Sequence, residues 1–462
     1  MGSDWTYSQL GDLVSIKGGK RLPKGEALSE QPNDHPYIRV RDLTGGRIDA
    51  EGLLYVPDEV FEKISRYTVD QGDIIMTIVG TVGLVAENPR SLHKASLTEN
   101  AAKLIVSEPE KLQSAYLRWY LSSTLGQNEV SINTVGSTQP KLPIYGIANI
   151  AIPLPPLPEQ KAIAHILGTL DDKIELNRRM NATLEGMAQA LFKSWFVDFD
   201  PVIDNAIEAG NPIPDELADR AEVRRQALAN GTANREAAKP FPAAFAFTEE
   251  MGWIPEGWEV NQLGEITTEI RRGISPKYTD EQGVRVLNQR CIRDHKISYA
   301  NARRNDTMKR KVDGRLLRAG DVLINSTGVG TLGRIAQIQS LEEPTAVDSH
   351  VTVARPDQSQ YMPFTFGRMM TSLEPQIEAM GHGSTGQTEL SRADLAVMPV
   401  IVPSKPTQKL AENLLSEWAS KVAHSSIQSD ALRKQRDALL PRLISGKLRV
   451  SGSEERIKEE VS

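Results

Sequence analysis

Basic and amide side chains gather in glycine-bearing loops at two places in this chain of 462 residues. Arginine and asparagine can grip guanine and adenine edges with two hydrogen bonds each, whereas lysine mainly neutralises phosphate. Glycine lets a backbone approach a duplex closely. The candidates for contact with double-stranded DNA are Lys17, Lys20, Arg21, Lys24, Arg39 and Arg41 in the first place, and Arg271, Arg272, Lys277, Asn288 and Arg290 in the second.

A denser basic run follows the second set, at Arg303, Arg304, Lys309, Arg310 and Lys311. Phosphate contact and an ordinary solvated loop explain such a run equally well. The two glycine-bearing loops are a stronger signal, because their position in the chain recurs while their sequence does not. This divergence suits two surfaces that recognise different targets.

The motifs that would give the chain a catalytic centre fail on their context. Gly328-Val-Gly330-Thr-Leu-Gly333 matches the dinucleotide-binding fingerprint, which needs a helix after it. The following residues 334–339 alternate like a strand, so a tight turn between two strands is the better interpretation. The chain also lacks a GxxxxGK[ST] phosphate loop and the Asn/Asp-Pro-Pro-Tyr/Phe motif with which amino-methyltransferases hold an extruded adenine. No catalytic residue is predicted.

Metal-binding patterns are equally weak. The seven histidines form no His-x-x-x-His pair, and the single cysteine, Cys291, excludes an internal disulfide and a cysteine-built zinc site. Asp198 and Asp200 resemble a paired-carboxylate site, but they stand beside Pro201 at the end of a helical stretch. A capping or linker role is the simpler interpretation. No metal site is predicted.

Much of the sequence occurs twice, with an offset of about 250 residues. The order of the matched segments is the same in both copies, which chance similarity would not maintain. The sequence therefore predicts an internal duplication. The matched pairs are Trp5–Asp12 with Trp258–Glu265, Val69–Met76 with Leu317–Ile324, Gly80–Gly83 with Gly330–Gly333, Gly136–Thr138 with Gly383–Thr385, Ile150–Pro156 with Val397–Pro403, and Pro158–Lys161 with Pro406–Lys409.

Each copy changes character along its length. Short β-branched runs broken by Gly, Pro and Asp predict a mainly β domain with a few helices. A long helix is expected next, because apolar residues then recur by fours and threes, as in a coiled coil. Two helices with matching apolar stripes most simply pack antiparallel. The predicted stripes are Ile163, Leu167, Leu170, Ile174, Met180, Leu184, Met187 and Leu191 with the polar Asn177, and Ala411, Leu415, Trp418, Val422, Leu432, Leu439 and Leu443 with Ser425 and Ser429.

The overall composition is that of an ordinary globular protein, with 39% hydrophobic and 25% charged residues. Its length suits three or four domains. No run of 18 apolar residues is present, the N-terminus lacks the features of a secretory signal, and one cysteine suits a reducing environment. We therefore expect a cytoplasmic protein.

The net charge of −6 conceals two unlike regions. Residues 270–335 contain fifteen Lys or Arg against six Asp or Glu, whereas residues 200–259 contain five against twelve. The acidity thus belongs to a connecting segment, and the basic excess lies where the DNA-contact candidates are. An acidic total is therefore compatible with nucleic-acid binding.

Four segments carry a family resemblance: Ile152–Ile163, Leu170–Ile174, Phe192–Asp200 and Leu439–Leu448. With them, nearly the whole chain resembles the specificity (S) subunit of type I restriction–modification systems. The resemblance implies an α+β fold with a pseudo-two-fold internal repeat. Two β-rich target recognition domains would be joined and spaced by two long antiparallel coiled-coil-like helices.

The resemblance also implies a non-catalytic role. Each recognition domain would read one half of a bipartite DNA target, and the helices would set the half-site spacing and dock two methyltransferase (M) subunits. Restriction (R) subunits would join this complex. The chain itself would need no cofactor, because S-adenosylmethionine is expected on the M subunits. Ser404–Gln408 matches the family motif less well than Pro155–Gln160, so the two docking surfaces need not be equal.

The alternative is a coiled-coil, protein-binding adaptor without direct DNA readout. The expected domains are a first recognition domain at 1–155, a central spacer helix at 156–198, an acidic linker at 199–255, a second recognition domain at 256–403, a C-terminal spacer helix at 404–449 and a charged tail at 450–462.

Overall fold

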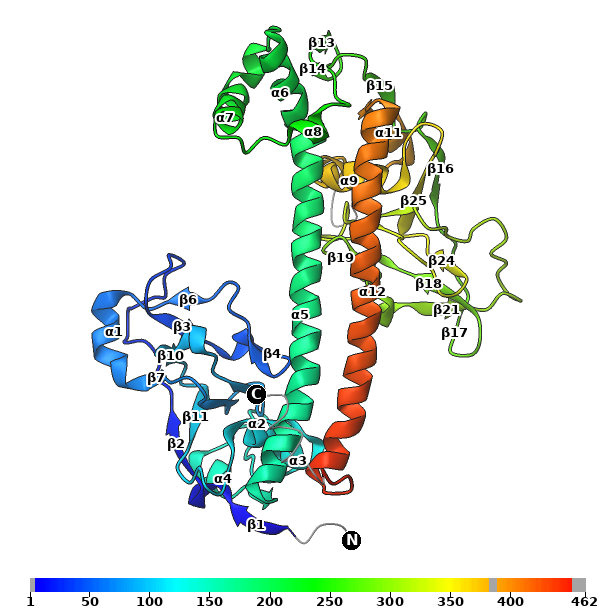
Figure 1. The fold of residues 1–462 in the computed structure, drawn as a ribbon. Coiled ribbons are helices and arrows are strands. Elements are labelled where there is room, and N and C mark those ends of the chain that lie inside the picture. The colour runs from blue at the N-terminus through cyan, green and yellow to red at the C-terminus, as the bar shows by residue number, and fades with distance from the viewer. Residues whose placement is uncertain (1–4, 382–388, 451–462) are drawn as a thin grey trace. The chain divides into compact units, whose positions relative to one another are not determined.

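The computed structural model describes residues 5–381 and 389–450 and divides into two compact units (Figure 1). Unit 1 contains the chain up to Asn177 and from Gln428 onward, and unit 2 contains Arg178–Ile427. The matched segment Gly383–Thr385 lies outside the described residues, as does the charged tail beyond residue 450.

Unit 1 contains two four-stranded sheets and two short pairs. The first sheet is antiparallel, and the second contains one parallel pair, β3 with β10. In spatial order the sheets are β2 (Val14–Gly18), β11 (Ala101–Val106), β8 (Ile74–Thr77) and β9 (Val85–Glu87), and β6 (Leu54–Tyr55), β3 (Pro36–Ile38), β10 (Ala95–Leu97) and β7 (Thr68–Val69); the pairs are β1 (Thr6–Gln9) with β12 (Ala151–Leu154) and β4 (Leu43–Thr44) with β5 (Arg47–Ile48).

Unit 2 repeats the order of the first sheet and, in the second sheet, the run β21, β18 and β24 repeats β6, β3 and β10, including the parallel pair, β18 with β24. The fourth strand of the second sheet differs: β17 lies beside β21 in unit 2, whereas β7 lies beside β10 in unit 1. The internal repeat predicted from the sequence is thus confirmed. The sheets are β16 (Thr267–Arg272), β25 (Val351–Pro356), β22 (Val322–Asn325) and β23 (Ile335–Gln337), and β17 (Tyr278–Thr279), β21 (Arg303–Asn305), β18 (Val284–Leu287) and β24 (Thr345–Val347); the pairs are β15 (Glu259–Gln262) with β26 (Pro399–Val402) and β19 (Ile292–Arg293) with β20 (Lys296–Ile297).

Short helices pack against the sheets. The helices are α1 (Asp58–Ile64), α2 (Ser114–Ser122), α3 (Thr124–Ile132) and α4 (Ile144–Ala148) in unit 1, and α9 (Pro363–Ser372), α10 (Glu374–Ala379) and α11 (Arg392–Val397) in unit 2. In unit 1, α2 and α4 contact the sheet of β2, β8 and β9, and α1 packs against Tyr37 of β3 in the other sheet; in unit 2, α9 contacts β23. Central strands such as β8 and β22 are buried along their whole length, which explains their continuous apolar sequence.

Two helices of 40 residues, α5 (Leu157–Phe196) and α12 (Lys405–Ile444), run antiparallel in both units. In unit 1, Asn177 Nδ2 donates to Gln428 Oε1 at 2.9 Å and to Ser429 Oγ at 3.2 Å. In unit 2, Asn181 Nδ2 donates to Ser426 Oγ at 3.1 Å. Amide–hydroxyl pairs such as these fix the register between two helices.

The predicted stripe holds along α12 but not along the whole of α5. Met180 and Met187 are exposed, at 41% and 46%. The buried face continues instead through Ala188, Phe192 and Trp195, which enter the core of unit 2. A straight α-helix has 3.6 residues per turn, so a stripe spaced by fours and threes drifts around it. The predicted stripe is therefore wrong at Met180 and Met187. In this part of α5 the buried residues are those that pack into the core of unit 2.

The segment expected as an acidic linker, 199–255, is folded. It contains α6 (Asp200–Ala209), α7 (Ala218–Ala229), α8 (Arg235–Ala238) and the hairpin of β13 (Phe245–Thr248) and β14 (Gly252–Pro255). Asp200 and Asp204, one helical turn apart, form bidentate pairs with Arg220 and Arg224, which are likewise one turn apart. The acidic residues are thus used to join α6 to α7.

Two motif interpretations can be compared with the structure. The glycine motif at 328–333 connects the antiparallel strands β22 and β23, so it is a turn between strands, as predicted. Asp198 binds Lys193, and Asp200 begins α6, in keeping with a role at helix ends.

Within residues 5–381 and 389–450, no three His, Cys, Asp or Glu side chains are arranged to hold a metal ion. Within the same ranges, no helix has the length and hydropathy that a membrane span requires.

Candidate nucleic-acid interface

In each unit a glycine lies where the start of the candidate loop passes close to the backbone of a neighbouring segment. Gly19 N donates to Ala101 O, and Gly273 N donates to Val351 O, both at 3.0 Å. A Cβ on Gly19 would lie 2.1 Å from Thr98 O, and a Cβ on Gly273 would lie 2.1 Å from the corresponding carbonyl oxygen of Asp348. Only glycine fits so close to a neighbouring backbone. The candidate loops therefore leave the sheets at equivalent points.

In unit 1 this loop turns most of its cations outward. Lys17, Lys20 and Lys24 are exposed, and Arg21 Nε contacts Glu99 Oε1 at 2.7 Å on the surface. The loop is held by Tyr37, whose hydroxyl donates to Lys20 O at 2.9 Å. Burial raises the pKa of Tyr37, so this hydroxyl keeps its proton and remains a donor.

In unit 2 the two guanidinium groups just before Gly273 are engaged within the protein. Arg271 Nε contacts Glu269 at 2.6 Å. Arg272 contacts Glu389 at 2.8 Å and Leu390 O at 2.9 Å. Lys277, further along, is exposed. Arg271 and Arg272 therefore hold the loop, and they would have to exchange these partners to reach a ligand.

A short helical turn presents one exposed arginine in each unit. Arg39 precedes the turn Val40–Asp42 and is held by Asp42, and Asn288 precedes the turn Gln289–Cys291 and accepts a hydrogen bond from Arg290 N. Arg41 and Arg290 occupy the same step of the two turns. The Arg41 side chain is 71% exposed, and Arg290 is also exposed. Arg39 and Asn288 thus position the turns, while Arg41 and Arg290 project from them.

Residues beside these arginines were not among the sequence candidates. In unit 1 a shallow hollow is lined by Arg41, Gly80, Thr81 and Asn100, among others. In unit 2 the corresponding hairpin contributes Thr327, whose Oγ1 lies 2.8 Å from His350 Nδ1 and 3.4 Å from Gln289 Oε1. The repeated Gly-Thr-x-Gly turn was the available signal, but it was interpreted only as a turn. Hydroxyl, amide and imidazole groups extend the hydrogen-bonding capacity of this face.

The basic run of unit 2 mixes bound and unbound cations. Arg303 stacks over the Tyr278 ring at 3.5 Å, and Arg304 forms a bidentate pair with Glu343. The hydrogen bond from Arg304 lowers the pKa of Glu343. Lys309 contacts Asp306 at 3.1 Å. Arg310 and Lys311 are exposed and have no salt-bridge partner within the described part of the chain.

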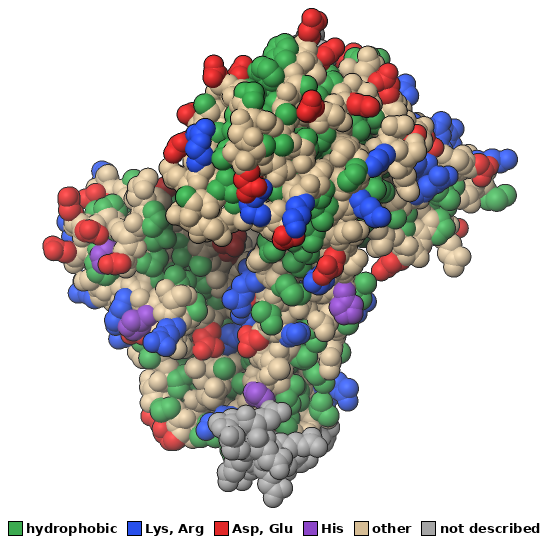
Figure 2. Space-filling view, turned by 45° about the horizontal axis from the view of Figure 1, so that its top comes forward, with side chains coloured by type: hydrophobic (Ala, Val, Ile, Leu, Met, Phe, Trp, Pro, Cys, Tyr) green, Lys and Arg blue, Asp and Glu red, His purple; other side chains and the backbone are tan. Residues whose placement is uncertain are grey.

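This face suits binding rather than bond making. It combines exposed guanidinium and ammonium groups with hydroxyl and amide groups, which donate to phosphate and to base edges. Figure 2 shows that basic side chains on the face drawn there are interspersed with acidic ones. In the candidate loops, Arg21 likewise lies beside Glu99, Arg271 beside Glu269 and Lys309 beside Asp306, so recognition would depend on individual contacts more than on a continuous basic field.

The known proteins that are similar to this chain are specificity subunits, and the similarity extends along nearly its whole length. Residues 2–186 match the model of the type I restriction modification DNA specificity domain. The type I restriction enzyme HindI specificity subunit of Haemophilus influenzae is 25% identical, covering 96% of this chain and 100% of its own length. The MjaIX specificity subunit of Methanocaldococcus jannaschii is 24% identical, covering 97% and 94%.

A solved structure shares the fold. The S subunit of a type I restriction–modification system from M. genitalium superimposes with a TM-score of 0.59 at 16% identity, covering 95% of this chain and 96% of that one. The full-length relatives are named specificity subunits, so the adaptor alternative is not favoured. The chain is thus similar over nearly its whole length to type I restriction–modification specificity subunits, and it shares the fold of the solved S subunit, with an internal repeat and paired antiparallel helices.

Proposed function

We propose that this chain provides the DNA-sequence specificity of a type I restriction–modification complex and carries out no catalysis itself. The recognition domain of each unit reads one half of a bipartite target in double-stranded DNA. Helices α5 and α12 set the half-site spacing and dock two methyltransferase subunits, and restriction subunits complete the assembly. S-adenosylmethionine is bound by the methyltransferase subunits. The complex acts in the cytoplasm.

One observation carries the proposal of two half-sites. Arg41 and Arg290 project from equivalent turns, each beside a Gly-Thr-x-Gly hairpin, while the loops around them differ in sequence. A shared scaffold with divergent surroundings is what two readers of different sequences need. Arginine at such a position can make bidentate contact with guanine.

The other candidate residues divide by their present contacts. Lys17, Lys20, Lys24, Lys277, Arg310 and Lys311 are exposed and are proposed as phosphate contacts. Arg21, Arg303 and Lys309 are exposed but have partners, at which phosphate would compete. Arg39, Arg271, Arg272, Asn288 and Arg304 are proposed to orient the loops, and they reach DNA only if they leave their partners.

The decisive experiment is methylation-site sequencing of DNA from a host that expresses this chain with its methyltransferase subunit. Replacing residues 1–155 by those of another family member should change one half-site and leave the other half and the spacing unchanged. A change in both halves would contradict the division of labour. Methyl transfer by the purified chain alone would contradict the non-catalytic role.

Two further measurements test the helices and the DNA contacts. Lengthening α5 around Glu175–Leu184 should alter the spacing while each half-site sequence is retained. Affinity of the complex for DNA should fall steeply and linearly on a logarithmic salt scale, because phosphate contacts release counterions. A flat salt response would contradict direct DNA binding.

A further inference from the structure

Strand β26 of unit 2 has an open edge in a cavity of about 530 Å³. It pairs with β15 on one side only. Leu263 N donates to Met398 O at 2.9 Å, and antiparallel pairing then turns every second carbonyl, those of Pro399 and Ile401, away from β15. Both residues line the cavity. Within residues 5–381 and 389–450, neither carbonyl accepts a hydrogen bond.

The equivalent edge of unit 1 is closed by two tyrosines. There, Ala151 and Pro153 take the places of Pro399 and Ile401. The Tyr120 hydroxyl donates to Ala151 O, and the Tyr116 hydroxyl donates to Pro153 O at 2.9 Å. Burial raises the pKa of both tyrosines, so both hydroxyls keep their protons. The outward carbonyls of unit 1 are therefore satisfied by phenol groups.

The helices that carry these groups can be aligned through a contact shared by the two units. Gln160 Oε1 accepts from Gln113 N, the residue before α2, and Gln408 Oε1 accepts from Met362 N, the residue before α9, both at 2.9 Å. The first turns of α2 and α9 therefore correspond residue by residue.

By this alignment, Tyr116 corresponds to Thr365 and Tyr120 corresponds to Met369. Neither residue of unit 2 has a phenol, and Met369 lines the cavity. The Thr365 hydroxyl is already bound to Glu412 at 2.8 Å. Unit 2 thus has the two carbonyl acceptors of unit 1 without their donors, together with space beside them.

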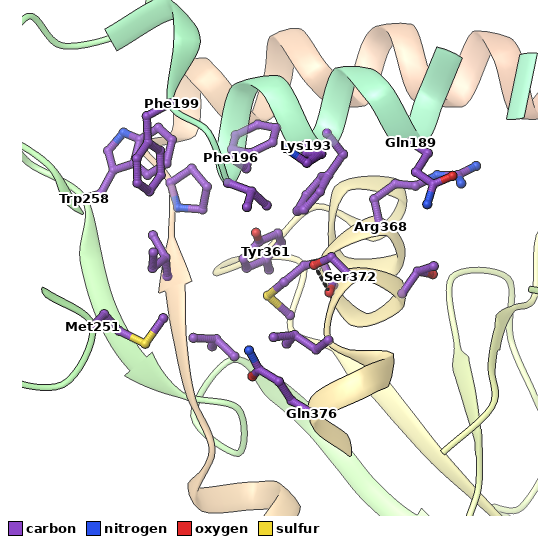
Figure 3. A pocket seen from close by; sticks show the side chains of 18 of the residues that line it. Gln189, Lys193, Phe196, Phe199, Met251, Trp258, Tyr361, Arg368, Ser372 and Gln376 are labelled. Carbon is purple, nitrogen blue, oxygen red and sulfur yellow. Dashed lines mark hydrogen bonds between the residues drawn. The ribbon is translucent and has the colours of Figure 1, made fainter. Parts of the chain in front are cut away.

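The rest of the lining suits a neutral ring. Figure 3 shows Phe196, Phe199 and Trp258 towards one end, with Tyr361 between them and the polar end. At the polar end, Arg368 is paired with Glu185 and Lys193 is paired with Asp198. Because these cations already have partners, an anion gains little from entering, whereas an aromatic ring gains from apolar burial and ring packing.

We propose that this cavity binds a neutral phenol ring whose hydroxyl donates to the carbonyl of Pro399 or Ile401, as tyrosine does in unit 1. The site is separate from DNA recognition and does not depend on the proposed function. Its ligand is either a small phenolic molecule or a tyrosine side chain of a partner polypeptide. The two sources share this chemistry and differ in whether a peptide backbone must be accommodated.

The test uses the full chain and the probe p-cresol, with toluene as the matched probe that lacks the hydroxyl. By calorimetry or ligand-observed NMR, p-cresol should bind saturably, and toluene should bind several-fold more weakly because the hydrogen bond is lost. Equal affinity of the two probes, or no saturable binding of p-cresol, would overturn the proposal. N-acetyltyrosinamide identifies the source: if it binds as tightly as p-cresol, a partner's tyrosine fits, and if it is excluded while p-cresol binds, the ligand is a small molecule.

Two variants place the residue of one unit at the equivalent position of the other. Met369→Tyr restores the phenol found in unit 1 and should abolish p-cresol binding; unchanged binding would overturn the proposal. Tyr120→Met opens the equivalent space in unit 1 and should raise the stoichiometry from one p-cresol to two, with an increase in Tm on adding p-cresol. This second variant tests the same geometry even if Met369→Tyr folds poorly, and an unchanged stoichiometry would count against it. Methylation-site sequencing of both variants keeps the outcome distinguishable from any loss of DNA specificity.

Discussion

The two units attach the start of their long helices through the same glutamine contacts but differ in the contacts that hold the helices further along. Gln160 and Gln408 are both fully buried, and each bonds one backbone N–H and two carbonyl groups of its own unit. Eleven residues after each glutamine the units differ, because Asp171 stands in unit 1 where Ala419 stands in unit 2.

Asp171 is a buried carboxylate shared by three arginines. Its oxygens lie 3.1 Å from Arg47, 2.7 Å from Arg436 and 3.8 Å from Arg118. Ala419 is buried and, as an apolar side chain, requires none of these partners. Duplication therefore kept the glutamine contacts to the backbone, while the position eleven residues further along changed from a charge-paired side chain to a small apolar one.

Removing the carboxylate should produce the largest effect. Asp171→Ala leaves three guanidinium groups close together without their common anion, and we expect unit 1 to lose about 3–5 kcal/mol of unfolding free energy. Urea denaturation followed by amide hydrogen exchange would assign the loss to unit 1. Ala419→Ser is the matched control in unit 2 and should cost much less. Equal losses from both substitutions would contradict the contrast between charged and apolar support.

Removing the shared glutamine contacts should affect both units alike. Gln160→Leu and Gln408→Leu each leave buried backbone groups without partners, at about 3 kcal/mol per substitution. Hydrogen exchange should show each loss in the substituted unit alone. If one substitution were harmless, the glutamine contacts would not be equivalent in the two units.

The exposed arginines Arg41 and Arg290 allow the two units to be compared in DNA recognition. Arg41→Ala and Arg290→Ala should each weaken DNA binding about tenfold and relax sequence preference in a different half-site, since a bidentate base contact contributes about 1–3 kcal/mol. Binding assays with each half-site mutated in turn would measure this. Arg310→Ala is the control, expected to reduce affinity for all sequences similarly. If either arginine variant relaxed both halves, the two surfaces would not read separately.

The smallest effect concerns one turn that the units form from different residues. Gly45 and Gly46 join β4 to β5 with positive φ, whereas Asp294 and His295 do so between β19 and β20 at φ of 50° and 57°. His295 lies 3.3 Å from Glu374, and this hydrogen bond raises the pKa of the imidazole above 6.5.

Because the folded-state pKa is the higher one, the His295–Glu374 pair stabilises unit 2 fully below about pH 6.5, and this contribution is lost as the pH rises through the raised pKa. The contribution is below about 1 kcal/mol for a partly exposed pair. His295→Gly, which copies unit 1, should remove this part of the pH dependence of Tm between pH 6 and 8. An unchanged pH profile would show that the pair contributes nothing.

Features of the fold that depend on local pattern or repetition could be predicted from the sequence. The duplication, the β-rich domains, the two long helices and the turn at 328–333 are examples. The exposure of Met180 and Met187 could not, because it depends on which of two surfaces the helix packs against. The folded structure of residues 199–255 could have been predicted from the spacing of Asp200 and Asp204, which matches that of Arg220 and Arg224. The overall composition of this segment does not show that spacing.

The candidate interface could be located from the sequence, but its roles could not be assigned. Lysine and arginine types predicted where the loops lie, whereas the pairing of Arg272 with Glu389 joins residues 117 positions apart. Such partners are set by the tertiary fold. Asn100 and His350 were not identified for the same reason, since each reaches the face only through the strand pairing of its unit.

The packing of Leu443 and Ile444 into the core of unit 1 has a consequence for synthesis. Leu10, near the start of the chain, shares that core with these residues from the end of α12. A ribosome elongating at about 5–20 residues per second must therefore make all of unit 2 before unit 1 can complete its core. Nascent chains that stop early would leave that core open and apolar, which exposes the kind of surface that chaperones bind.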